Sequence, residues 1–287
     1  MLEGVLFDFT PSSEDAINLR FLCDDLHTWN IRFIQNQGGA GSTVDLYRDM
    51  VHCLALSPQN CLAITDSYEG VLSAKAAGIP CIGYEAPGTA DNLSGAYAII
   101  QSFRFVDPGY LSRTHAHALS YPAFIIRTER LVIRELSEED FPVLYAMCTE
   151  PATAAFMDEV LSDYDTEQEK HLAYLRNIYP FYELALWGVY ERETGKLVGR
   201  VGFSLPEDDS DCYWLGYLID APYRGRGYAT ECVRAALHFA SCQECRWVSA
   251  KIRKNNPISV KVLEQCLFPY ECTGETADAW IYRIDLA

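Results

Sequence analysis

The chain has 287 residues, which favours two domains, because a single hydrophobic core seldom grows beyond about 150–200 residues before a chain divides. Its 40 acidic residues exceed its 23 basic ones and give a net charge of −17, which repels nucleic-acid phosphates and argues against a nucleic-acid partner. The apolar runs are too short to cross a bilayer, and no basic-then-apolar leader opens the sequence. We therefore expect a soluble, cytoplasmic protein without a membrane partner.

Eleven cysteines are scattered along the chain, and their odd number argues against a framework of disulfides. The closest cluster is His238, Cys242 and Cys245, which would supply half of a zinc site. No second pair of ligands follows at the required spacing, so no metal site is expected there.

Short apolar segments alternate with segments of helical periodicity in the first part of the chain. A glycine-rich loop at residues 38–42 precedes the second of these helices. Such alternation predicts a parallel sheet with helices on its faces, which is a Rossmann-like α/β layer. Strands are expected at residues 4–9, 31–35, 61–65, 80–84 and 97–100, and helices at residues 13–30, 43–56 and 68–77.

Residues 107–122 contain Asp-Pro-Gly, several polar positions and Tyr-Pro, a composition typical of turns and linkers. We therefore place the domain boundary there and expect one domain over residues 1–122 and a second over residues 123–287. Both parts are acidic, so charge does not distinguish their functions.

The second domain is predicted to be an α+β structure with a mixed, mainly antiparallel sheet. Ser137 and the three acids after it are typical of a helix start, and short turns join the next three strands into a meander. Strands are expected at residues 130–136, 186–191, 197–205, 213–219, 246–252, near 268 and at 279–285, and helices at residues 137–148, on to about 179, 228–241 and 257–266.

The turn at residues 222–230 lies between an expected strand and an expected helix. Gly225 and Gly227 allow the main chain to turn closely and to expose successive N–H groups, and Arg224 and Arg226 add positive charges. These features predict an anion-binding cradle in an otherwise acidic protein. An ordinary strand-to-helix turn with two solvated arginines is the alternative.

Residues 224–229 resemble the Arg/Gln-x-x-Gly-x-Gly/Ala signature of the GNAT family of N-acetyltransferases, in which this loop binds the pyrophosphate of acetyl-coenzyme A. Residues 127–134 resemble the opening strand of the branch that includes ribosomal-protein N-terminal acetyltransferases. Residues 215–219 resemble the strand that holds the pantetheine arm, and residues 256–264 resemble the family's Asn-x-x-Ser helix. The resemblance covers residues 125–287 and implies a GNAT fold that uses acetyl-coenzyme A. The coenzyme-binding residues it implies are Leu218, Ile219, Arg224, Gly225, Arg226, Gly227, Tyr228, Ala229, Thr230, Asn256 and Ser259.

The resemblance leaves the catalytic residues unassigned, because the sequence departs from the family pattern. Leu263 stands where the family's proton-donating tyrosine would be, Trp214 where related sequences often have glutamate, and Leu267 where a glycine is usual. Asn256 is also a good helix N-cap, so capping and coenzyme contact are alternatives for it. The candidates for proton transfer, by their positions near strand ends, are Glu183, Asp211 and Tyr217.

The acceptor implied by the resemblance is a primary amine, a peptide N-terminus or a small molecule, that attacks the thioester directly. An acidic run from Glu150 to Glu169 contains no basic residue before Lys170. It is either a solvated helix face or an entrance that favours a cationic amine. Because the expected tyrosine and glutamate are missing, a sensor that binds acyl-coenzyme A without transferring the acyl group is the alternative function.

The first domain resembles the core of the haloacid dehalogenase superfamily without its cap domain. Residues 5–10 resemble the nucleophile strand, and residues 61–78 resemble the metal-binding strand and its helix. Active members carry Asp-x-Asp, but here Asp8 is followed by Thr10, which breaks the catalytic set. Asp8 and Asp66 could still hold magnesium, although we interpret them as remnants. We expect a scaffold, a homodimerisation surface or a regulatory module, with a magnesium-dependent phosphatase as a third hypothesis.

Overall fold

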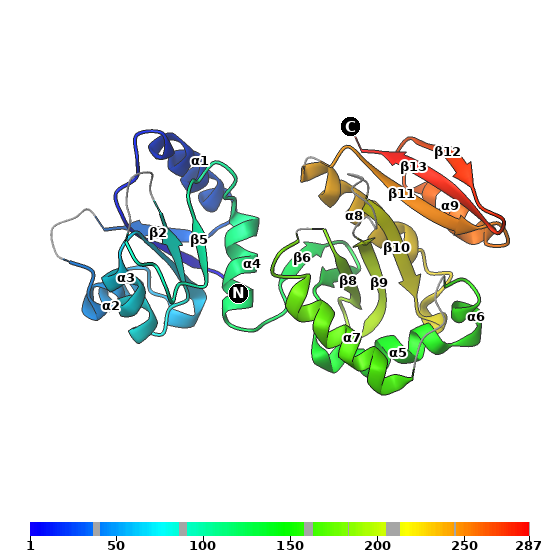
Figure 1. Ribbon diagram of the computed structural model, residues 1–287, viewed down its shortest axis with the longest axis horizontal. Helices are drawn as coiled ribbons and strands as arrows, with labels where there is room; N and C mark the ends of the chain where they lie inside the picture. Colours follow the sequence, from blue (N-terminus) through cyan, green and yellow to red (C-terminus); the bar gives the residue numbers. More distant parts are fainter. Residues whose placement is uncertain are drawn as a thin grey trace. The chain divides into compact units, whose positions relative to one another are not determined.

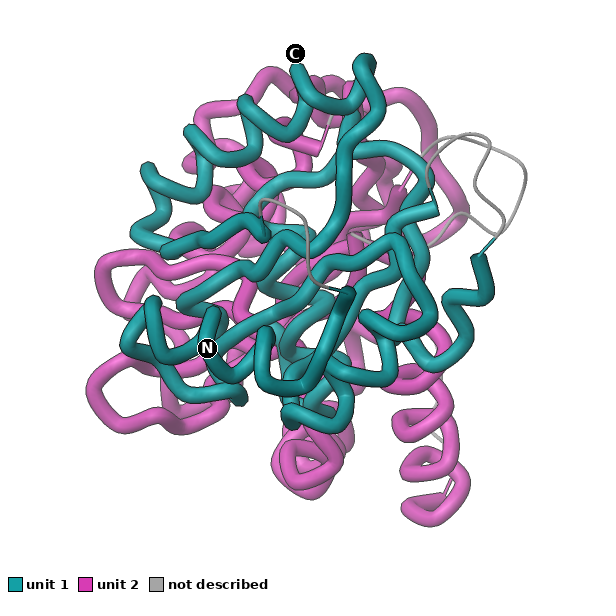
Figure 2. Tube along the Cα trace, turned by 90° about the vertical axis from the view of Figure 1, so that its left-hand side faces the viewer, with its two compact units in different colours: residues 1–123 teal, residues 124–287 magenta. Residues whose placement is uncertain are grey.

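The structure is a computed structural model that describes residues 1–36, 41–85, 91–157, 163–182, 184–204, 213–243 and 245–286. The chain divides into two units, Met1–Ala123 and Phe124–Ala287 (Figure 1, Figure 2). None of the helices in the described ranges combines the length and the apolar composition that crossing a bilayer requires.

Unit 1 alternates strands and helices along the chain, as its sequence predicts. Its elements are β1 (Gly4–Asp8), α1 (Asp15–Thr28), β2 (Arg32–Gln35), α2 (Val44–Cys53), a 3₁₀ turn (Pro58–Asn60), β3 (Cys61–Thr65), α3 (Tyr68–Ala76), β4 (Cys81–Tyr84), β5 (Ala98–Ile100) and α4 (Pro108–Ala118). The strands form a five-stranded sheet in the order β2-β1-β3-β4-β5, and every neighbouring pair is parallel. The predicted parallel sheet is therefore confirmed.

Helices cover both faces of this sheet, because successive side chains of a strand point in opposite directions. In β1, Val5 and Phe7 pack with residues of α1 and α4, whereas Leu6 packs with residues of α2 and α3. Tyr84 belongs to the first of these clusters and Tyr47 to the second, and both tyrosines are fully buried. Unit 1 is therefore a three-layer α/β fold.

The linker expected at residues 107–122 is wrong, because α4 occupies most of that segment. Asp107 caps α4 by accepting a hydrogen bond from the N–H of Tyr110 at 2.6 Å, and Pro108 occupies the first turn. Leu111 is fully buried in the core of unit 1. Asp-Pro-Gly therefore begins a helix here instead of marking a turn.

Unit 2 begins with a strand that the sequence did not predict and continues with the predicted elements. These are β6 (Phe124–Arg127), β7 (Leu131–Arg134), a 3₁₀ turn (Glu138–Asp140), α5 (Phe141–Thr149), α6 (Pro151–Ala154), α7 (Tyr164–Asn177), β8 (Leu186–Glu191), β9 (Leu197–Ser204), β10 (Tyr213–Ile219), a 3₁₀ turn (Ala221–Tyr223), α8 (Tyr228–Cys242), β11 (Trp247–Arg253), α9 (Pro257–Gln265), β12 (Tyr270–Glu275) and β13 (Ala279–Asp285). The eight-stranded sheet has the order β12-β13-β11-β10-β9-β8-β7-β6. All described pairs are antiparallel except β10 with β11, so the sheet is mixed and mainly antiparallel, as predicted.

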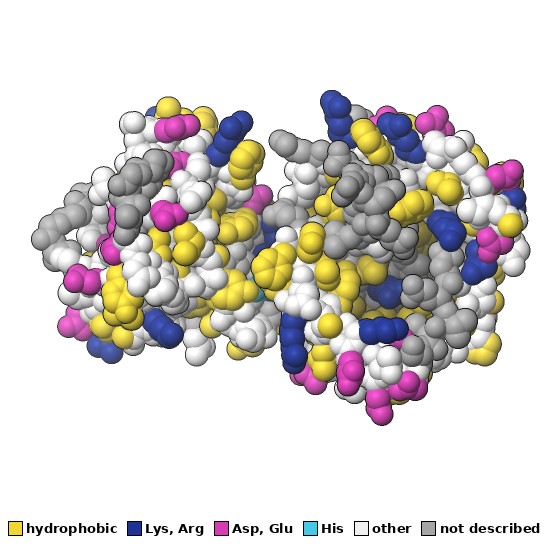
Figure 3. All heavy atoms as spheres, viewed as in Figure 1, with side chains coloured by type: hydrophobic (Ala, Val, Ile, Leu, Met, Phe, Trp, Pro, Cys, Tyr) yellow, Lys and Arg dark blue, Asp and Glu magenta, His cyan; other side chains and the backbone are white. Residues whose placement is uncertain are grey.

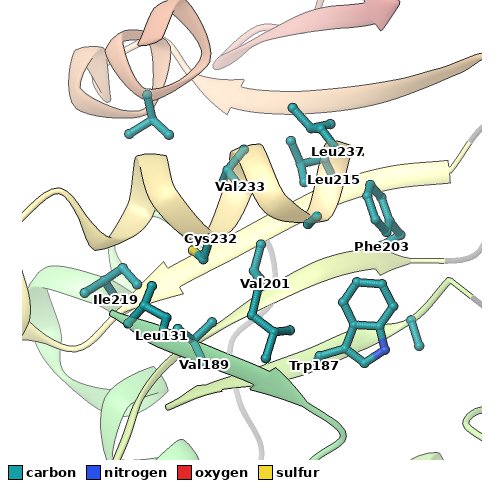
Figure 4. Close-up of a cluster of buried hydrophobic side chains, with 14 of the residues drawn as sticks. Leu131, Trp187, Val189, Val201, Phe203, Leu215, Ile219, Cys232, Val233 and Leu237 are labelled. Atoms are coloured by element: carbon teal, nitrogen blue, oxygen red, sulfur yellow. The ribbon is translucent and has the colours of Figure 1, made fainter. Parts of the chain in front are cut away.

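The core of unit 2 contains the contact between α8 and the sheet (Figure 4). Trp187 and Val201 come from the neighbouring strands β8 and β9, and Cys232, Val233 and Leu237 come from α8; all five are buried. Burying a side chain such as valine or leucine contributes roughly 1.5–3 kcal/mol. This packing fixes α8 on the sheet and holds the start of the helix just after the end of β10.

Candidate functional site

The turn between β10 and α8 has the backbone conformation that its glycines allow. Gly225 and Gly227 have φ angles of 76° and 80°, in the left-handed region where a residue with a Cβ is strained. Gly227 directly precedes α8, and no side chain caps this helix. Within the described residues, side-chain caps are also missing at α1 and α5, whereas α2, α3, α4, α7 and α9 have them. The first turn of α8 therefore offers uncapped N–H groups and the positive end of the helix dipole, which suit an anion.

Arg224 lies at this turn, but neighbouring residues engage its guanidinium. Nε donates to the carbonyl oxygen of Ile219 at 2.9 Å, and Nη2 donates to the Thr153 hydroxyl at 2.5 Å. Nη2 is also 3.5 Å from a carboxylate oxygen of Glu150. Hydrogen bonds from the Thr153 hydroxyl and the Ala152 N–H, and then the Arg224 charge, hold the pKa of Glu150 below its usual range. Arg224 therefore ties the end of β10 to α6 and brings less free charge to the turn than the sequence suggests.

Arg226 is exposed and is the less engaged of the two arginines. Its guanidinium carbon lies 5.0 Å from the centre of the Tyr223 ring, and Nη2 donates to the carbonyl oxygen of Pro222 at 3.1 Å. Glu191 is 3.9 Å from Arg226 Nη1 and accepts a hydrogen bond from the Tyr228 hydroxyl at 2.8 Å. The charge of Arg226 therefore stays at the surface of the turn, while Tyr228 is anchored to β8.

Strands β10 and β11 separate toward the C-terminal end of β10, which is the end that leads into this turn. Their parallel ladder has two residue pairs, of which Tyr213 with Val248 is the first. β10 nevertheless continues to Ile219 in its ladder with β9. Among the described strands, residues 215–219 of β10 thus have a partner on one side only. Their other edge offers main-chain N–H and C=O groups to a ligand.

Helix α9 is tied to β10 beyond the point where the ladder ends. The Tyr217 hydroxyl donates to the carbonyl oxygen of Ser259 at 3.0 Å. Asn256 caps α9 by accepting a hydrogen bond from the N–H of Ser259 at 3.2 Å, with Pro257 in the first turn, so the structure shows the capping role for Asn256. Leu263 is buried in the core at 2% exposure, and α9 therefore carries no hydroxyl at the position expected for the tyrosine.

Of the three candidates for proton transfer, Tyr217 lies within the described residues, whereas Glu183 and Asp211 lie outside them. Burial raises the pKa of Tyr217, so its phenol stays protonated. Its proton is donated to the Ser259 carbonyl, and its ring packs against the core of unit 2. This geometry gives Tyr217 a structural contact between β10 and α9.

Neighbouring residues engage several carboxylates of the acidic run at residues 150–169. Asp163 caps α7 by accepting a hydrogen bond from the N–H of Thr166 at 3.1 Å. Glu167 forms an ion pair with Lys170 at 2.8 Å. Figure 3 shows acidic side chains near α5 and α7 with basic side chains close to them. The run therefore contributes less free negative charge than its sequence suggests.

Asp8, at the end of β1, is enclosed by three neutral hydrogen-bond donors. Its carboxylate accepts from Asn36 Nδ2 at 2.8 Å, Ser42 Oγ at 2.7 Å and the Tyr47 hydroxyl at 2.8 Å. Burial above all raises the pKa of Asp66 at the end of β3, and the nearby Asp8 charge adds to this. The donors satisfy the Asp8 carboxylate without a metal, and no group of three metal-ligating side chains occurs in the part of the chain that is described.

Two residues that the sequence did not single out join the turn to the start of β7. Arg130 and Glu231 form an ion pair in which Nη2 and Oε2 are 2.6 Å apart. They are separated by 101 residues, so their spacing gives no signal. An arginine before a strand and a glutamate in the first turn of a helix are the sequence features present, and both are common on protein surfaces.

Comparison with known proteins identifies the class of unit 2. Residues 130–268 match the family model described as an acetyltransferase (GNAT) domain. The protein is an N-acetyltransferase, and acetyl-coenzyme A is its acyl donor. Residues 130–268 form its GNAT domain, in the part of the chain where the motifs predict that fold.

Three known proteins show the extent of the similarity. The uncharacterized N-acetyltransferase p20 of Bacillus licheniformis is 24% identical over 151 residues, which are 50% of this chain and 82% of that protein. The uncharacterized N-acetyltransferase YoaA of Bacillus subtilis (strain 168) is 23% identical over 155 residues, 51% of this chain and 84% of that protein. The crystal structure of an acetyltransferase from Agrobacterium tumefaciens C58 is 24% identical, covers 55% of this chain and 92% of that one, and has a TM-score of 0.48.

Proposed function

We propose that unit 2 transfers the acetyl group of acetyl-coenzyme A to a primary amine, either a peptide N-terminus or a small molecule. The observation that carries this proposal is the uncapped start of α8 behind Gly225 and Gly227, next to the edge of β10 that has left β11. An anion at a helix N-terminus meets several N–H groups and the positive end of the dipole. The pyrophosphate of the coenzyme is such an anion.

Each part of the coenzyme has a matching part in the proposed site. The pyrophosphate would lie on the main chain of residues 225–230, beside the exposed charge of Arg226. The pantetheine arm would lie along the free edge of β10, where Leu218 and Ile219 offer main-chain groups. Asn256, by capping α9, fixes the helix on the opposite wall.

Bound acetyl-coenzyme A supplies an acyl group that is activated as a thioester, so a neutral amine can attack its carbonyl carbon without a covalent enzyme intermediate. The new N–C bond forms as the C–S bond breaks; the amine nitrogen must lose a proton and the leaving thiolate must gain one. Glu183 and Asp211, which precede β8 and β10 in the sequence and lie outside the described residues, stay the candidates for the base. Tyr217 holds α9 in this proposal and does not deliver the proton.

A cationic amine is the acceptor class that the charge of the chain favours. The net charge of −17 attracts such molecules at long range, and Asp165 and Glu169 of α7 are exposed. Long-range attraction raises the rate of encounter and weakens as salt is added. An amine panel measured at two ionic strengths would therefore show a larger salt effect for a polyamine than for a monoamine.

We propose that unit 1 is a haloacid dehalogenase-like scaffold without phosphatase chemistry. Thr10 stands in place of the second catalytic aspartate, and three side chains of the unit already use the Asp8 carboxylate. A scaffold of this kind leaves homodimerisation or regulation as its contribution to the enzyme.

The experiment that tests the coenzyme site is a calorimetric titration of the whole chain with acetyl-coenzyme A. We expect one-to-one binding in the micromolar range. Arg226→Glu should weaken binding more than ~10-fold, since it puts a carboxylate in place of the exposed positive charge beside the proposed pyrophosphate site, where a charge-assisted contact of roughly 1.5–3 kcal/mol would act. Arg246→Glu is the matched control, because Arg246 is exposed at the other end of the neighbouring strand and the net charge changes equally. Absence of binding by the natural sequence would overturn the proposed site.

A second measurement separates a transferase from a sensor. Acetylated product would be detected by mass spectrometry after the protein is incubated with acetyl-coenzyme A and a panel of primary amines. Product formed with any amine disposes of the sensor. Tight coenzyme binding with no product across peptides, polyamines and amino sugars would favour the sensor, for which the buried Leu263 is the supporting observation.

A further inference from the structure

The Arg130 side chain contacts the turn before α8, although no sequence motif pointed to this residue. Its Nη1 donates to the carbonyl oxygen of Arg226 at 2.8 Å, within the turn itself. Its guanidinium carbon lies 4.9 Å from the centre of the Tyr228 ring, at the first residue of α8. A Cβ built on Gly227 would come within 3.4 Å of Nη2. Arg130 therefore contacts Arg226 in the turn and Tyr228 at the helix start, and it lies beside Gly227 between them.

Glu231 fixes the position of the Arg130 side chain from the other direction. Arg130 Nε donates to Oε2 of Glu231 at 2.7 Å, and the Arg130 main-chain N–H donates to Oε1 at 2.9 Å. The Thr128 hydroxyl donates to the same Oε1 at 2.5 Å. The Glu231 side chain is 16% exposed and the Arg130 side chain is 45% exposed, so the carboxylate is shielded from solvent while the guanidinium is partly open to it. Together these bonds clamp the segment before β7 onto the first turn of α8.

We propose that Arg130 is a positioning residue for the coenzyme loop, which it holds in the binding conformation through Arg226 and Glu231 without itself contacting the coenzyme. The inference rests on the proposed function of unit 2, because it takes residues 225–230 as the pyrophosphate site. The turn needs such support, since two of its residues occupy the left-handed region and its helix has no side-chain cap. A loop ordered before binding saves the coenzyme the free-energy cost of ordering it.

The ion pair between Arg130 and Glu231 also sets the net charge at the start of α8. A carboxylate in the first turn stabilises a helix, but it repels an anion that binds at the same N-terminus. Burial would raise the pKa of Glu231, yet hydrogen bonds from Thr128 and Arg130 outweigh burial and keep its pKa below the usual range. Glu231 is therefore ionised at neutral pH, and Arg130 neutralises a negative charge next to the proposed pyrophosphate site.

Removing the charge of Glu231 separates positioning from direct contact, because the two roles predict opposite signs. If Arg130 bound the pyrophosphate directly, Glu231→Gln would free its charge and remove a repulsive one, so acetyl-coenzyme A would bind more tightly. If Arg130 positions the loop, Glu231→Gln loosens the clamp, and we expect this loss to exceed the gain from removing a charge that Arg130 already neutralises, so binding weakens. We expect a loss of about 3–10-fold for Glu231→Gln and about tenfold or more for Arg130→Gln.

The control is Arg192→Ala, which removes an arginine that follows β8 and contacts the segment before β7. Arg192 Nη1 donates to the carbonyl oxygens of Thr128 and Glu129 at 3.0 and 2.7 Å, and no contact of its side chain with residues 225–231 is found among the described residues. Affinity for acetyl-coenzyme A should stay within about twofold in this variant. Hydrogen exchange of the amides of residues 225–230, measured without coenzyme, should rise in Arg130→Gln and Glu231→Gln and stay unchanged in Arg192→Ala. The more conservative Arg130→Lys should restore part of the exchange protection.

The outcomes distinguish the inference from the function on which it rests. If the natural sequence binds acetyl-coenzyme A and Arg130→Gln binds equally tightly with unchanged exchange, the positioning role is overturned and the proposed function stands. Tighter binding by Glu231→Gln also overturns positioning, in favour of direct contact. If the natural sequence does not bind the coenzyme, the proposed site is wrong and the positioning role falls with it, even where exchange shows that Arg130 orders the turn.

Discussion

The Tyr217 hydroxyl donates to the carbonyl oxygen of Ser259 at 3.0 Å and so joins β10 to α9 beyond the two residue pairs at which β10 meets β11. The ring packs against the core of unit 2, and burial raises the pKa of the phenol. A strand that leaves its neighbour needs another contact to hold its position, and this hydrogen bond is one. The hydroxyl of Tyr217 therefore has a structural role, because it holds β10 against α9.

Tyr217→Phe tests that role. The variant keeps the ring and loses the hydrogen bond, so we expect its free energy of unfolding to be about 1 kcal/mol lower. The alkaline limb of the pH–rate profile for acetyl transfer should stay where it is, because the phenol is not the proton donor. A drop in kcat of a hundredfold with that limb abolished would instead make Tyr217 the general acid.

Leu267 shows how a departure from a family pattern appears in the backbone. Helix α9 ends at Gln265, Cys266 follows as its C-cap, and Leu267 has a φ angle of 65° with 80% of its surface exposed. This is the left-handed position after a helix that glycine usually occupies. The backbone therefore keeps the conformation of the expected glycine although the residue is leucine.

Leu267→Gly should accordingly stabilise unit 2. A side chain in the left-handed region costs roughly 1–2 kcal/mol of stability, and glycine removes this strain. Glycine is also more flexible in the unfolded chain, which offsets part of the gain. We expect a net gain of about 0.5–1 kcal/mol in urea unfolding. Ile258→Gly is the control, because Ile258 is 76% exposed within the same helix, and it should cost up to about 1 kcal/mol. A loss of stability for Leu267→Gly would contradict the strain argument.

Asp15 is a buried carboxylate that joins α1 to the segment after β5. Its oxygens accept hydrogen bonds from the Tyr84 hydroxyl at 2.8 Å, the Ser102 hydroxyl at 2.8 Å and the Phe103 N–H at 2.9 Å. Burial would raise its pKa, but these bonds outweigh burial and leave the pKa below its usual value. The ionised form is therefore the one that stabilises unit 1.

Asp15→Asn should reduce the free energy of unfolding by about 2 kcal/mol at pH 7, since hydrogen bonds to a charged group contribute roughly 1.5–3 kcal/mol. The folded pKa is lower than the unfolded value of about 3.9, so this contribution is complete above that pH and is lost as pH falls through the folded pKa. Urea unfolding at pH 7, 5 and 3 should show the difference narrowing only at pH 3. The exposed Asp25→Asn on the same helix should change stability by less than about 0.5 kcal/mol throughout.

Local patterns predicted the elements that carry the candidate site. Gly225 and Gly227 could be recognised because a left-handed turn before a helix needs glycine, and the parallel sheet of unit 1 because strands alternate with helices. The two errors have local causes as well. Asp107 and Pro108 are equally typical of a turn and of a helix start, and β6 has only four residues at the edge of its sheet.

The contacts inside the site could not be predicted, because they join residues that are distant in the sequence. Thr153 and Arg224 are 71 residues apart, and Thr128 and Glu231 are 103 apart. Both pairs form only when α6 or the segment before β7 packs beside the turn. Sequence reasoning therefore places the arginines at the turn and misses which of their charges are already balanced.

Asp8 provides the last prediction, which concerns magnesium. A divalent cation that bound the folded chain with a Kd of about 0.1 mM would add roughly 2.7 kcal/mol of stability at 10 mM. Because Asn36, Ser42 and Tyr47 already satisfy the Asp8 carboxylate, we expect 10 mM magnesium to leave the unfolding midpoint of unit 1 unchanged within about 1 °C. Differential scanning calorimetry of the whole chain, with and without magnesium, measures this shift.

Two variants show whether Asp8 is a structural hub. Asp8→Ala leaves the buried Tyr47 hydroxyl without its acceptor and should lower the free energy of unfolding of unit 1 by about 2–4 kcal/mol, as for the loss of a buried hydrogen-bonding carboxylate. Asp66→Asn, which removes a charge next to Asp8, should change stability far less and should not alter the response to magnesium. A magnesium-dependent rise in the unfolding midpoint that Asp66→Asn abolishes would support magnesium binding at Asp8 and Asp66 and contradict this prediction. If the chain also hydrolysed a generic phosphate ester and Asp8→Asn abolished that activity, the phosphatase hypothesis would be supported.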